Sequence, residues 1–382
     1  MYKKIIITCV TYYPDVNGVQ FVTQNLAEGL VRKGYEVTVV TEKKANREKN
    51  ERKNGVNIVR IDMHNYHMWH YGNRKEYNRT ILQLSNKADA IIFVNLQSVA
   101  ADWAVDILDK IKCQKILYQH GIHSFEWEKI DMQSIKNMAL KFIRNIRWKE
   151  FYLRNKKKFC MFDKIIHLHG KDYSYQFFEQ ICNGKNFVLE NFAEDIFFEI
   201  KNDIVDIKEK YAIANCKYMI YVSNYCTRKN QELLLKVFNE LNVELNLIMI
   251  GANENQYLEK LKKKVRKEGV YLLTNVERKD IATILQNAMF FVMPSKWERY
   301  PIVLTECMAA GIPYISSDVG IVKHLPGGMV VNPDKESFID AIKTMFYDKQ
   351  LYGQKRKEVM EYAMEHYKFE KYLESFIKIL EK

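Results

Sequence analysis

Two glutamates, eight positions apart, are the acidic side chains of this chain with the most useful spacing for chemistry. Glu298 lies in a loop after a short apolar run, and Glu306 lies in the second turn of a predicted helix, so both can border one pocket. Pro301 suits the first position of that helix, and Tyr300 at the expected N-cap offers no short capping oxygen. The N–H groups of residues 302–305 therefore lack a local partner and suit a phosphate. Taken singly, each glutamate is better explained as a solvated acid, but the whole arrangement favours a binding site.

Metal and thiol chemistry have weaker support in the sequence. His64, His67 and His70 have the spacing of metal ligands, but the aromatic, amide and methionine residues between them favour an aromatic acceptor-binding loop. No cluster of carboxylates or cysteines accompanies them, as a metal site would require. The seven cysteines are scattered and never spaced as Cys-x-x-Cys, so we expect reduced thiols and no redox function.

Short apolar runs alternate with amphipathic stretches along the chain, and they predict the elements that position these residues. The first half contains predicted strands at residues 4–10, 36–41, 56–61, 90–94, 115–118, 164–168 and 187–189. The pattern restarts with predicted strands at residues 218–222, 245–250, 270–273, 290–293, 313–316 and 329–331. Helical segments separate most of them, and three helices close the chain at residues 336–346, 352–366 and 369–382. Two successive β-α-β series predict two doubly wound α/β domains with mostly parallel sheets.

The predicted domain boundary lies in the polar, acid-rich stretch 191–207. We place the N-terminal domain at residues 1–195 and the C-terminal domain at residues 196–366. The last helix, at about residues 367–382, is expected to pack back on the N-terminal domain. Two similar halves leave a cleft between the carboxyl ends of their sheets, where ligands of open α/β sheets bind.

The segment 293–313 resembles the signature of the retaining GT-B glycosyltransferases of the family 4 type. In this segment the two glutamates form a Glu-x7-Glu pair, preceded by a Pro-Ser strand end and followed by Met-Ala-Ala-Gly-Ile-Pro. The sequence of residues 316–320, Ser-Ser-Asp-Val-Gly, resembles the loop that follows in the family. Residues 13–19, Tyr-Pro-Asp-Val-Asn-Gly-Val, resemble the first loop of the same family. The resemblance covers nearly the full chain through the order and spacing of these fragments. It implies a GT-B fold, in which two Rossmann-like domains face a central cleft.

The resemblance implies a role for each matching residue of the C-terminal domain, where the nucleotide sugar would bind. Glu298 would face the donor sugar near its hydroxyls and reacting carbon, and Glu306 would hydrogen-bond the ribose of the nucleotide. The backbone N–H groups of Ile302 and Val303 would bind the diphosphate. Lys229 would neutralise the leaving diphosphate, because a fixed cation stabilises the charge that builds on the departing phosphate.

Two residues of the N-terminal, acceptor-side domain also match the family. Gly18 corresponds to the glycine whose backbone closely approaches the donor, where a side chain would block the approach. His120 follows a strand end as the family's first-domain histidine does, and it would contact the transferred sugar. The alternative to a sugar-binding role is a histidine that lies on the surface or has its hydrogen bonds satisfied within the protein. This alternative is a stronger rival for His123 than for His120.

The chain departs from the family pattern around the lysine and the first glutamate. The family's Gly-Arg pair is replaced by Ser223-Asn224, and Arg228 offers a guanidinium from a neighbouring position as a donor-binding group. Arg299 and Pro301 replace glycines after the first glutamate, and Pro301 cannot donate a hydrogen bond. These changes concern the identity of the donor more than the fold or the reaction class.

Composition and charge exclude several other classes of function. The chain has 382 residues, of which 47% are hydrophobic and 28% charged, as in an ordinary globular protein. Its apolar runs are far shorter than the ~20 residues that span a bilayer, and the run after Lys4 is too short for a signal peptide. We therefore expect a cytoplasmic protein. The net charge of +12 favours anionic partners, but no recognisable nucleic-acid motif accompanies it.

Nine basic residues and one acid lie between Lys136 and Lys158, inside a predicted helix at residues 135–159. Ile135, Phe142 and Ile146 share one face of this helix, with lysines and arginines opposite. This pattern predicts peripheral contact with the inner face of an anionic plasma membrane, where a lipid-linked acceptor resides. Two alternatives stay open: the apolar face packs on the N-terminal sheet, or the basic face lies beside a phosphorylated acceptor.

The leading hypothesis is a retaining glycosyltransferase that moves a sugar from a nucleoside-diphosphate sugar, with UDP as the first expectation, to a glycan or lipid-linked acceptor. The resemblance places such enzymes in the synthesis of bacterial surface polysaccharides. The chain contains no Asp-x-Asp, so we expect neither a metal nor another cofactor. The alternatives are a nucleotide-sugar epimerase of the same fold, which needs no acceptor, and a non-catalytic GT-B binding module.

Overall fold

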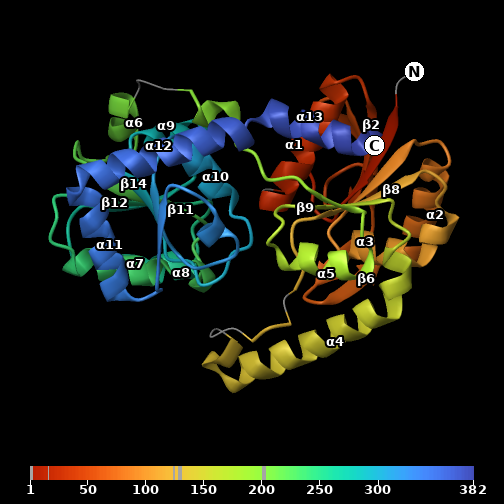
Figure 1. The fold of residues 1–382 in the computed structure, drawn as a ribbon, viewed down its shortest axis with the longest axis horizontal. Coiled ribbons are helices and arrows are strands. Elements are labelled where there is room, and N and C mark those ends of the chain that lie inside the picture. The colour runs from red at the N-terminus through yellow and green to blue at the C-terminus, as the bar shows by residue number, and fades with distance from the viewer. Residues whose placement is uncertain (1–2, 16, 124, 128–130, 200–203) are drawn as a thin grey trace. The chain divides into compact units, whose positions relative to one another are not determined.

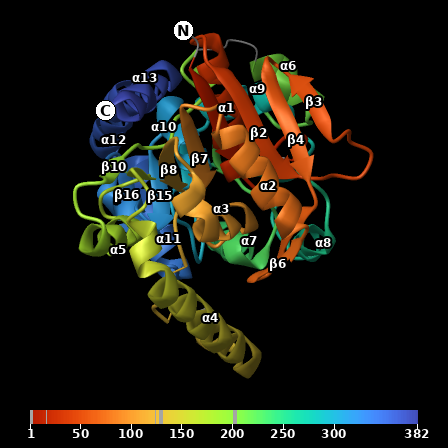
Figure 2. The same cartoon turned by 90° about the vertical axis from the view of Figure 1, so that its right-hand side faces the viewer.

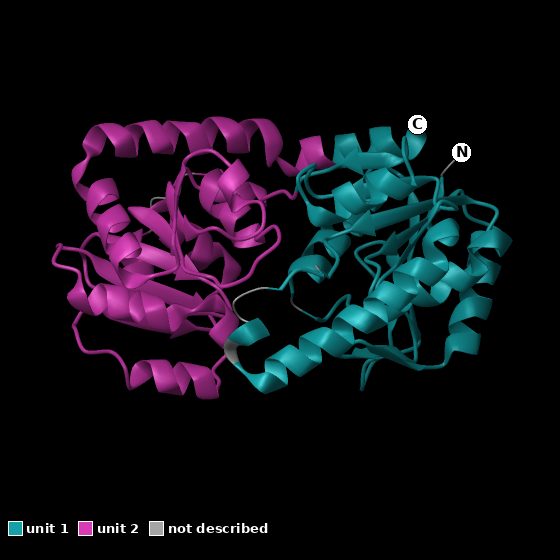
Figure 3. Cartoon of the chain, turned by 60° about the horizontal axis from the view of Figure 1, so that its bottom comes forward, with its two compact units in different colours: residues 1–190, 373–382 teal, residues 191–372 magenta. Residues whose placement is uncertain are grey.

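The structure, a computed structural model, describes residues 3–15, 17–123, 125–127, 131–199 and 204–382. The chain forms two compact units (Figure 3): unit 1 comprises Met1–Glu190 with Leu373–Lys382, and unit 2 comprises Asn191–Tyr372. The sequence placed this boundary after residue 195, and the units divide after Glu190. None of the described helices is long and apolar enough to cross a membrane.

Unit 1 is built on an eight-stranded sheet in which only the edge strand β3 is antiparallel to its neighbour (Figure 1). In spatial order the strands are β10 (Asn186–Val188), β9 (Lys164–His167), β8 (Gln114–Gln119), β7 (Ala90–Val94), β1 (Lys4–Thr8), β2 (Glu36–Glu42), β4 (Val56–Ile61) and β3 (Asn50–Lys53). The strand order reverses between β1 and β7. This topological switch point is where ligands bind in open α/β sheets.

Helices connect the strands of unit 1. They are α1 (Gly18–Arg32), α2 (Arg74–Ser85), α3 (Val99–Ala104), the 3₁₀ segment η1 (Val105–Lys110), α4 (Ile135–Phe159) and α5 (Tyr173–Ile181). The helix α1 begins where the Asn17 side chain accepts a hydrogen bond from the Gln20 N–H (2.9 Å), and it ends before Gly34, whose φ is +88°.

The last helix, α13 (Phe369–Glu381), brings the end of the chain to the sheet of unit 1. The Lys164 ammonium of β9 donates to the carbonyl oxygens of Ile379 (2.5 Å) and Leu380 (3.0 Å). These carbonyls belong to the last turn of the helix, which has no backbone partner for them, so the lysine completes the helix end. Residues 373–382 therefore belong structurally to unit 1.

The helix α4 packs through the aromatic side chains of its C-terminal half and leaves the large apolar side chains of its N-terminal half exposed. Trp148, Tyr152 and Phe159 are buried, whereas the Ile135 and Phe142 side chains are 86% and 58% exposed. In Figures 1 and 2 the helix extends away from the rest of unit 1. The alternative that the apolar face of residues 135–146 packs on the sheet is therefore wrong, because the face that packs carries the aromatic residues of the C-terminal half.

Unit 2 contains a six-stranded, fully parallel sheet. Its strands lie in the order β13 (Val270–Thr274), β12 (Asn246–Gly251), β11 (Tyr218–Val222), β14 (Phe290–Met293), β15 (Tyr314–Ser317) and β16 (Gly328–Val331). The helices are α6 (Ile204–Lys210), α7 (Gln231–Glu240), α8 (Gln256–Lys262), α9 (Arg278–Gln286), α10 (Ile302–Ala309), α11 (Lys335–Tyr347) and α12 (Lys349–His366). The strand order reverses between β11 and β14, which is the switch point of a Rossmann-like domain.

The sequence predicted two doubly wound units, and the structure confirms them. Every predicted strand is present, with ends that differ by two residues at most from those observed. The sequence missed β3 and the hairpin of β5 (Met63–Tyr66) and β6 (Trp69–Gly72), in which Tyr66 pairs with Trp69. The segment 64–70 is therefore a hairpin and not a loop; its strands are too short, and too rich in histidine and aromatic residues, to show an alternating apolar pattern.

Candidate functional site

The two strands at the switch point of unit 2 each lead into a segment that carries a predicted site residue. The segment after β11 contains Lys229, in a short 3₁₀ turn that ends at Asn230 with a φ of +56°. The segment after β14 contains Glu298. Neighbouring parallel strands end at the same edge of a sheet, so the topology brings together residues that are 69 positions apart in the chain.

Lys229 and Glu298 form an ion pair at this edge of the sheet. The two side chains are only 15% and 9% exposed, respectively. The Ser295 hydroxyl also donates to the Glu298 carboxylate (2.7 Å), and the Tyr221 hydroxyl lies 2.7 Å from the Ser295 oxygen. The carboxylate is therefore held in one orientation by a cation and a hydroxyl that are both anchored in the sheet.

Glu306 lies apart from this pair, in a second ion pair with Arg278 of α9. Its side chain is 4% exposed, so it is not the solvated acid that the residue type alone would favour. Burial raises the pKa of the Glu306 carboxyl, and the Arg278 guanidinium opposes that shift. The same guanidinium binds Glu194 (Nε–Oε2 2.6 Å). The sequence analysis missed Arg278, because a contact across 28 residues has no local pattern.

The start of α10 differs by one residue from the prediction. Pro301, not Tyr300, is the N-cap residue, and it makes no side-chain capping bond. The Leu304 N–H donates to the Pro301 carbonyl (3.0 Å), so it is not free. Within the described part of the chain, the N–H groups of Ile302 and Val303 have no hydrogen-bond acceptor. These are the two donors that the sequence analysis assigned to a diphosphate.

The loop that carries Glu298 is held by the segment after β15. Gly320 has a φ of +57°, and a Cβ atom there would lie 2.1 Å from the Arg299 carbonyl oxygen. The Ile321 N–H donates to that same oxygen (3.1 Å), and the Ser317 hydroxyl donates to the Ser295 carbonyl (2.5 Å). Only glycine fits this close approach, so residues 316–320 act as a support for the glutamate loop.

The two arginines at the departures from the family pattern lie beside one tryptophan. The guanidinium groups of Arg228 and Arg299 lie 5.3 and 5.1 Å from the centre of the Trp297 ring. Both are within the range of a cation–π contact. The Asn224 backbone carbonyl accepts a hydrogen bond from the Gln231 side chain (2.9 Å), which fixes the turn before Lys229.

In unit 1, His120 follows β8 as predicted, and its ring lies 4.4 Å from the ring of Tyr118. The residue is 9% exposed, its Nε2 atom is buried, and that atom lacks a hydrogen-bond partner among the described residues. Burial lowers the pKa of the His120 imidazole to about 3, so the ring is neutral at pH 7. The Asn95 side chain accepts a hydrogen bond from the His120 backbone N–H (2.6 Å). A buried, unsatisfied ring nitrogen is costly unless a ligand pairs with it.

Gly18 is the first residue of α1 and is exposed. It follows the segment after β1, which is one of the two strands at the switch point of unit 1. The other strand, β7, leads into the segment 95–98, whose Asn95 and Gln97 have φ angles of +59° and +64°. The sequence analysis did not single out this segment, although it positions His120 through Asn95.

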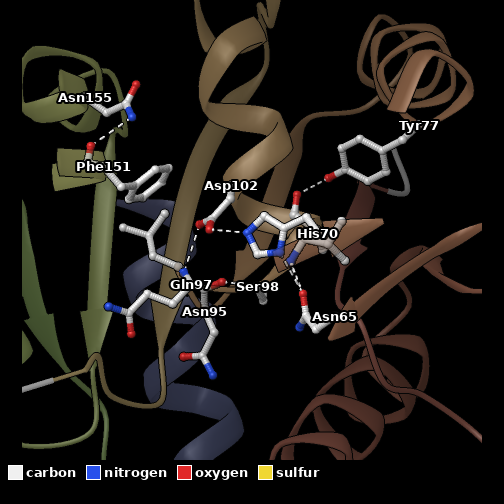
Figure 4. Close-up of polar contacts among 12 residues, drawn as sticks. Asn65, His70, Tyr77, Asn95, Gln97, Ser98, Asp102, Phe151 and Asn155 are labelled. Atoms are coloured by element: carbon white, nitrogen blue, oxygen red, sulfur yellow. Dashed lines mark hydrogen bonds and ion pairs between the residues drawn. The ribbon is translucent and has the colours of Figure 1, made fainter. Parts of the chain in front are cut away.

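The hairpin β5–β6 contains a polar cluster that the sequence analysis also missed (Figure 4). His70 Nε2 lies 2.7 Å from Asp102 Oδ2, and His70 Nδ1 lies 3.0 Å from Asn65 Oδ1. Asp102 also accepts from the Gln97 N–H (2.8 Å). Burial raises the pKa of the Asp102 carboxyl, and the hydrogen bond from His70 opposes that shift. In the part of the chain that the structure describes, no three His, Cys, Asp or Glu side chains are grouped to hold a metal ion.

Comparison with known proteins adds family models, curated relatives and solved structures. Residues 16–167 match the model described as Glycosyltransferase Family 4, and residues 203–366 match the model described as Glycosyl transferases group 1. The chain is 28% identical over 148 residues to the O-antigen chain mannosyltransferase B of Escherichia coli, an alignment that covers 36% of this chain and 39% of that protein.

A second relative and one structure extend the comparison. The chain is 25% identical over 261 residues to the UDP-Gal:alpha-D-GlcNAc-diphosphoundecaprenol alpha-1,3-galactosyltransferase of Escherichia coli, covering 61% of this chain and 60% of that protein. The alignments therefore span about three fifths or less of the length of these curated relatives. The structure of Anabaena HepE in complex with UDP-glucose is similar in fold, with a TM-score of 0.73, 13% identity and full coverage of both chains.

Two Rossmann-like units, each with its predicted site residues at the carboxyl edge of the sheet, define the GT-B class of proteins. Within that class, the two family models together cover most of the chain. The chain belongs to the family 4 type of glycosyltransferases, also described as glycosyl transferases group 1.

Proposed function

We propose that this protein is a retaining, metal-independent glycosyltransferase that transfers a sugar from a nucleoside-diphosphate sugar, UDP first, to a glycan or lipid-linked acceptor of a bacterial surface polysaccharide. The observation that carries the proposal is the Lys229–Glu298 ion pair at the switch point of unit 2. When a nucleotide sugar binds there, the cation can pair with its diphosphate and the carboxylate can accept hydrogen bonds from its sugar.

In the proposed reaction an acceptor hydroxyl attacks the anomeric carbon while the bond from that carbon to the diphosphate oxygen breaks. The acceptor proton passes to the departing phosphate, so no protein nucleophile is needed. Lys229 and the N–H groups of Ile302 and Val303 stabilise the charge that accumulates on the diphosphate. Glu298 binds the donor sugar, and the chain's contribution is positioning and electrostatic stabilisation.

The other predicted residues complete the donor site in this proposal. Glu306, oriented by Arg278, binds the ribose, and Arg228 supplies a guanidinium near the phosphates. From unit 1, Gly18 allows close approach of the backbone to the donor. The neutral ring of His120 offers Nε2, which has no hydrogen-bond partner among the described residues, to a hydroxyl of the transferred sugar, since a neutral imidazole can donate or accept a hydrogen bond.

The first test is donor binding followed by transfer, without added metal and in the presence of EDTA. Thermal shift with UDP, GDP and ADP, and with their sugars, identifies the nucleotide, because a ligand that binds the folded state raises its melting temperature. With that donor, Lys229→Ala and Glu298→Ala should each lower the transfer rate at least a hundredfold. Lys236→Ala is the control, because its side chain is 63% exposed in a surface pair.

Four outcomes would contradict parts of this proposal. Near-normal transfer by Lys229→Ala and Glu298→Ala would remove the site assignment. Loss of activity in EDTA would remove metal independence, and an inverted anomeric configuration in the NMR spectrum of the product would remove the retaining mechanism. Turnover of the nucleotide sugar to an epimer without any acceptor would replace the transferase by an epimerase.

We also propose that α4 holds the protein at an anionic membrane on its cytoplasmic side. Ile135 is 86% exposed and Phe142 58% exposed, on a helix with basic residues on its other faces. Apolar side chains with flanking cations bind the interface of anionic lipid. Ile135→Asp with Phe142→Asp should abolish sedimentation with phosphatidylglycerol vesicles and leave UDP-sugar binding intact. Val205→Asp, at a position 64% exposed in unit 2, is the control, and equal loss in both proteins would contradict the proposal.

A further inference from the structure

Unit 1 contains a cavity of about 250 Å³ that no residue of the proposed donor site lines. Four parts of unit 1 surround it: the hairpin β5–β6, the start of α2, the segment formed by α3 and η1, and the C-terminal half of α4. Three arginines line it, namely Arg74, Arg147 and Arg154, together with His70 and Trp69. The acids Asp102, Asp106 and Glu150 also line it.

Two of the acids already bind partners of their own. Asp106 binds Lys158 and Arg74 in a pair of ion contacts. Asp102 binds His70 at 2.7 Å and accepts the Gln97 N–H at 2.8 Å. Arg74 is therefore committed to Asp106. Of the cationic groups that line the cavity, Arg147 and Arg154 of α4 stay available to a ligand.

Arg147 and Arg154 are two helical turns apart on α4, so they face the same side of the helix. Neither makes a hydrogen bond or an ion pair within the part of the chain that the structure describes, and the buried Nε atom of Arg147 is without a partner there. Glu150 lies between them on the helix and is exposed to solvent. The cavity thus has two guanidinium groups on one wall that make no hydrogen bond or ion pair among the described residues, although the charge of Arg147 acts to lower the pKa of the nearby Asp102 carboxyl.

Arg147 is held in place by aromatic contacts. Its guanidinium carbon lies 5.2 Å from the centre of the Trp69 ring and 5.6 Å from the centre of the Trp148 ring. Contacts with ring faces fix a guanidinium without using its N–H donors, which lie in its own plane. A fixed guanidinium with free donors is the arrangement that binds an oxyanion through two parallel hydrogen bonds.

The cluster of Figure 4 holds Trp69 in position. Asn65 Oδ1 accepts the Val99 N–H (2.9 Å), so the atom that faces His70 Nδ1 is an oxygen and not the amide nitrogen. Both ring nitrogens of His70 therefore face acceptor oxygens. His70 ties the hairpin to α3 and is a positioning residue for the neighbouring Trp69.

We propose that this cavity binds a phosphate group carried by the acceptor substrate, with Arg147 and Arg154 as its ligands. The inference rests on the proposed function, because it assigns the cavity to the acceptor of that same transferase. Gln97 connects the two regions: its N–H binds Asp102, and its side chain accepts the His123 N–H (2.5 Å), three residues after His120. The cavity and the candidate catalytic histidine thus share one supporting loop.

The test is isothermal titration calorimetry on the full chain with α-glucose 1-phosphate, inorganic phosphate and glucose. We expect α-glucose 1-phosphate to bind with a Kd of about 1 mM or lower, inorganic phosphate at least threefold more weakly, and glucose not at all. Arg147→Gln and Arg154→Gln should each weaken the sugar phosphate at least fivefold, and together at least tenfold. Lys149→Gln is the matched control, because it removes one charge from an exposed position of α4 that does not line the cavity.

Each outcome decides the proposal. Equal weakening by Lys149→Gln and Arg147→Gln would show diffuse charge attraction and overturn it. Inorganic phosphate binding as tightly as the sugar phosphate would assign the cavity to the free anion and overturn the acceptor role. UDP binding, measured in the same samples, separates the two proposals: its absence from the wild-type chain contradicts the donor site, whereas its persistence in both arginine variants shows that they fold.

Discussion

At the scale of single residues, the candidate donor site contains two ion pairs whose carboxylates are buried. Lys229 with Glu298, and Arg278 with Glu306, are such pairs. Removal of one partner leaves the other charge buried without compensation, and this costs more stability than the pair contributes. A ligand that offers new partners can take over the pairing at a lower cost.

Arg278→Ala is expected to destabilise unit 2 through the carboxylate that it leaves behind. Glu306 is 4% exposed, but Arg278 is 39% exposed, so we expect about 2 kcal/mol instead of the 3–5 of a fully buried pair. Chemical denaturation measures the change. The double variant Arg278→Ala with Glu306→Gln should recover most of it, and a double variant as unstable as the single would contradict the account.

His120 makes the stability of unit 1 depend on pH in a specific direction. Its pKa is lowered by burial from 6.5 to about 3, so between these values the unfolded chain binds a proton that the folded chain does not. The contribution of His120 to the free energy of unfolding is therefore fully present above pH 6.5. It falls as the pH is lowered below 6.5, by at most ~1.4 kcal/mol per pH unit. Denaturation at pH 7.0, 5.5 and 4.5 should show a smaller loss in His120→Gln. Identical pH profiles for both proteins would refute this role.

At the scale of elements, the strands could be predicted from the sequence, but the contacts between elements could not. The strands β4, β7, β11 and β14 have the predicted ends, because each is a short run of buried apolar residues. The pairing of His70 with Asp102 joins a hairpin to a helix across 32 residues, and no spacing rule predicts it. The packed face of α4 was also missed, because the exposed apolar residues of its first half dominate the pattern.

Gly320→Ala tests the support of the glutamate loop. The added Cβ would lie 2.1 Å from the Arg299 carbonyl oxygen, so the loop must move in addition to the ~1–2 kcal/mol that a positive φ costs alanine. We expect a larger loss of stability than in Gly184→Ala, where φ is +78° and nothing lies within 4 Å of the added atom. Thermal melts and transfer rates separate the two variants. A fall in transfer of the same size in both would contradict a local effect on Glu298.

At the scale of the whole molecule, unit 1 is assembled from two parts of the chain. Phe376 of α13 is fully buried, and its ring lies 6.4 Å from the ring of Tyr118, two residues before His120. The sequence analysis expected the helix at about residues 367–382 to pack back on the first domain. The contacts that hold it, such as Lys164 on two carbonyl oxygens, involve residues more than 200 positions apart and left no local trace.

Phe376→Ala should therefore destabilise the distant N-terminal unit. Removal of a buried phenylalanine side chain costs about 3–5 kcal/mol, which lowers the melting temperature of unit 1 by several degrees. Differential scanning calorimetry in the presence and absence of UDP follows the effect, and Lys378→Ala on the same helix is the control. A melting curve unchanged from that of the control would contradict the tie between α13 and unit 1.

The return of α13 to unit 1 has a consequence for the order in which the chain is completed during synthesis. Residues 1–190 leave the ribosome first, but their last strand-to-helix contacts need residues 373–382. About 180 residues of unit 2 are translated in between, which takes roughly 10–40 s at bacterial or slower elongation rates. All residues of unit 2 are therefore synthesised before unit 1 is complete. Until α13 has been synthesised, the Lys164 ammonium and the Tyr118 ring lack their contacts with that helix.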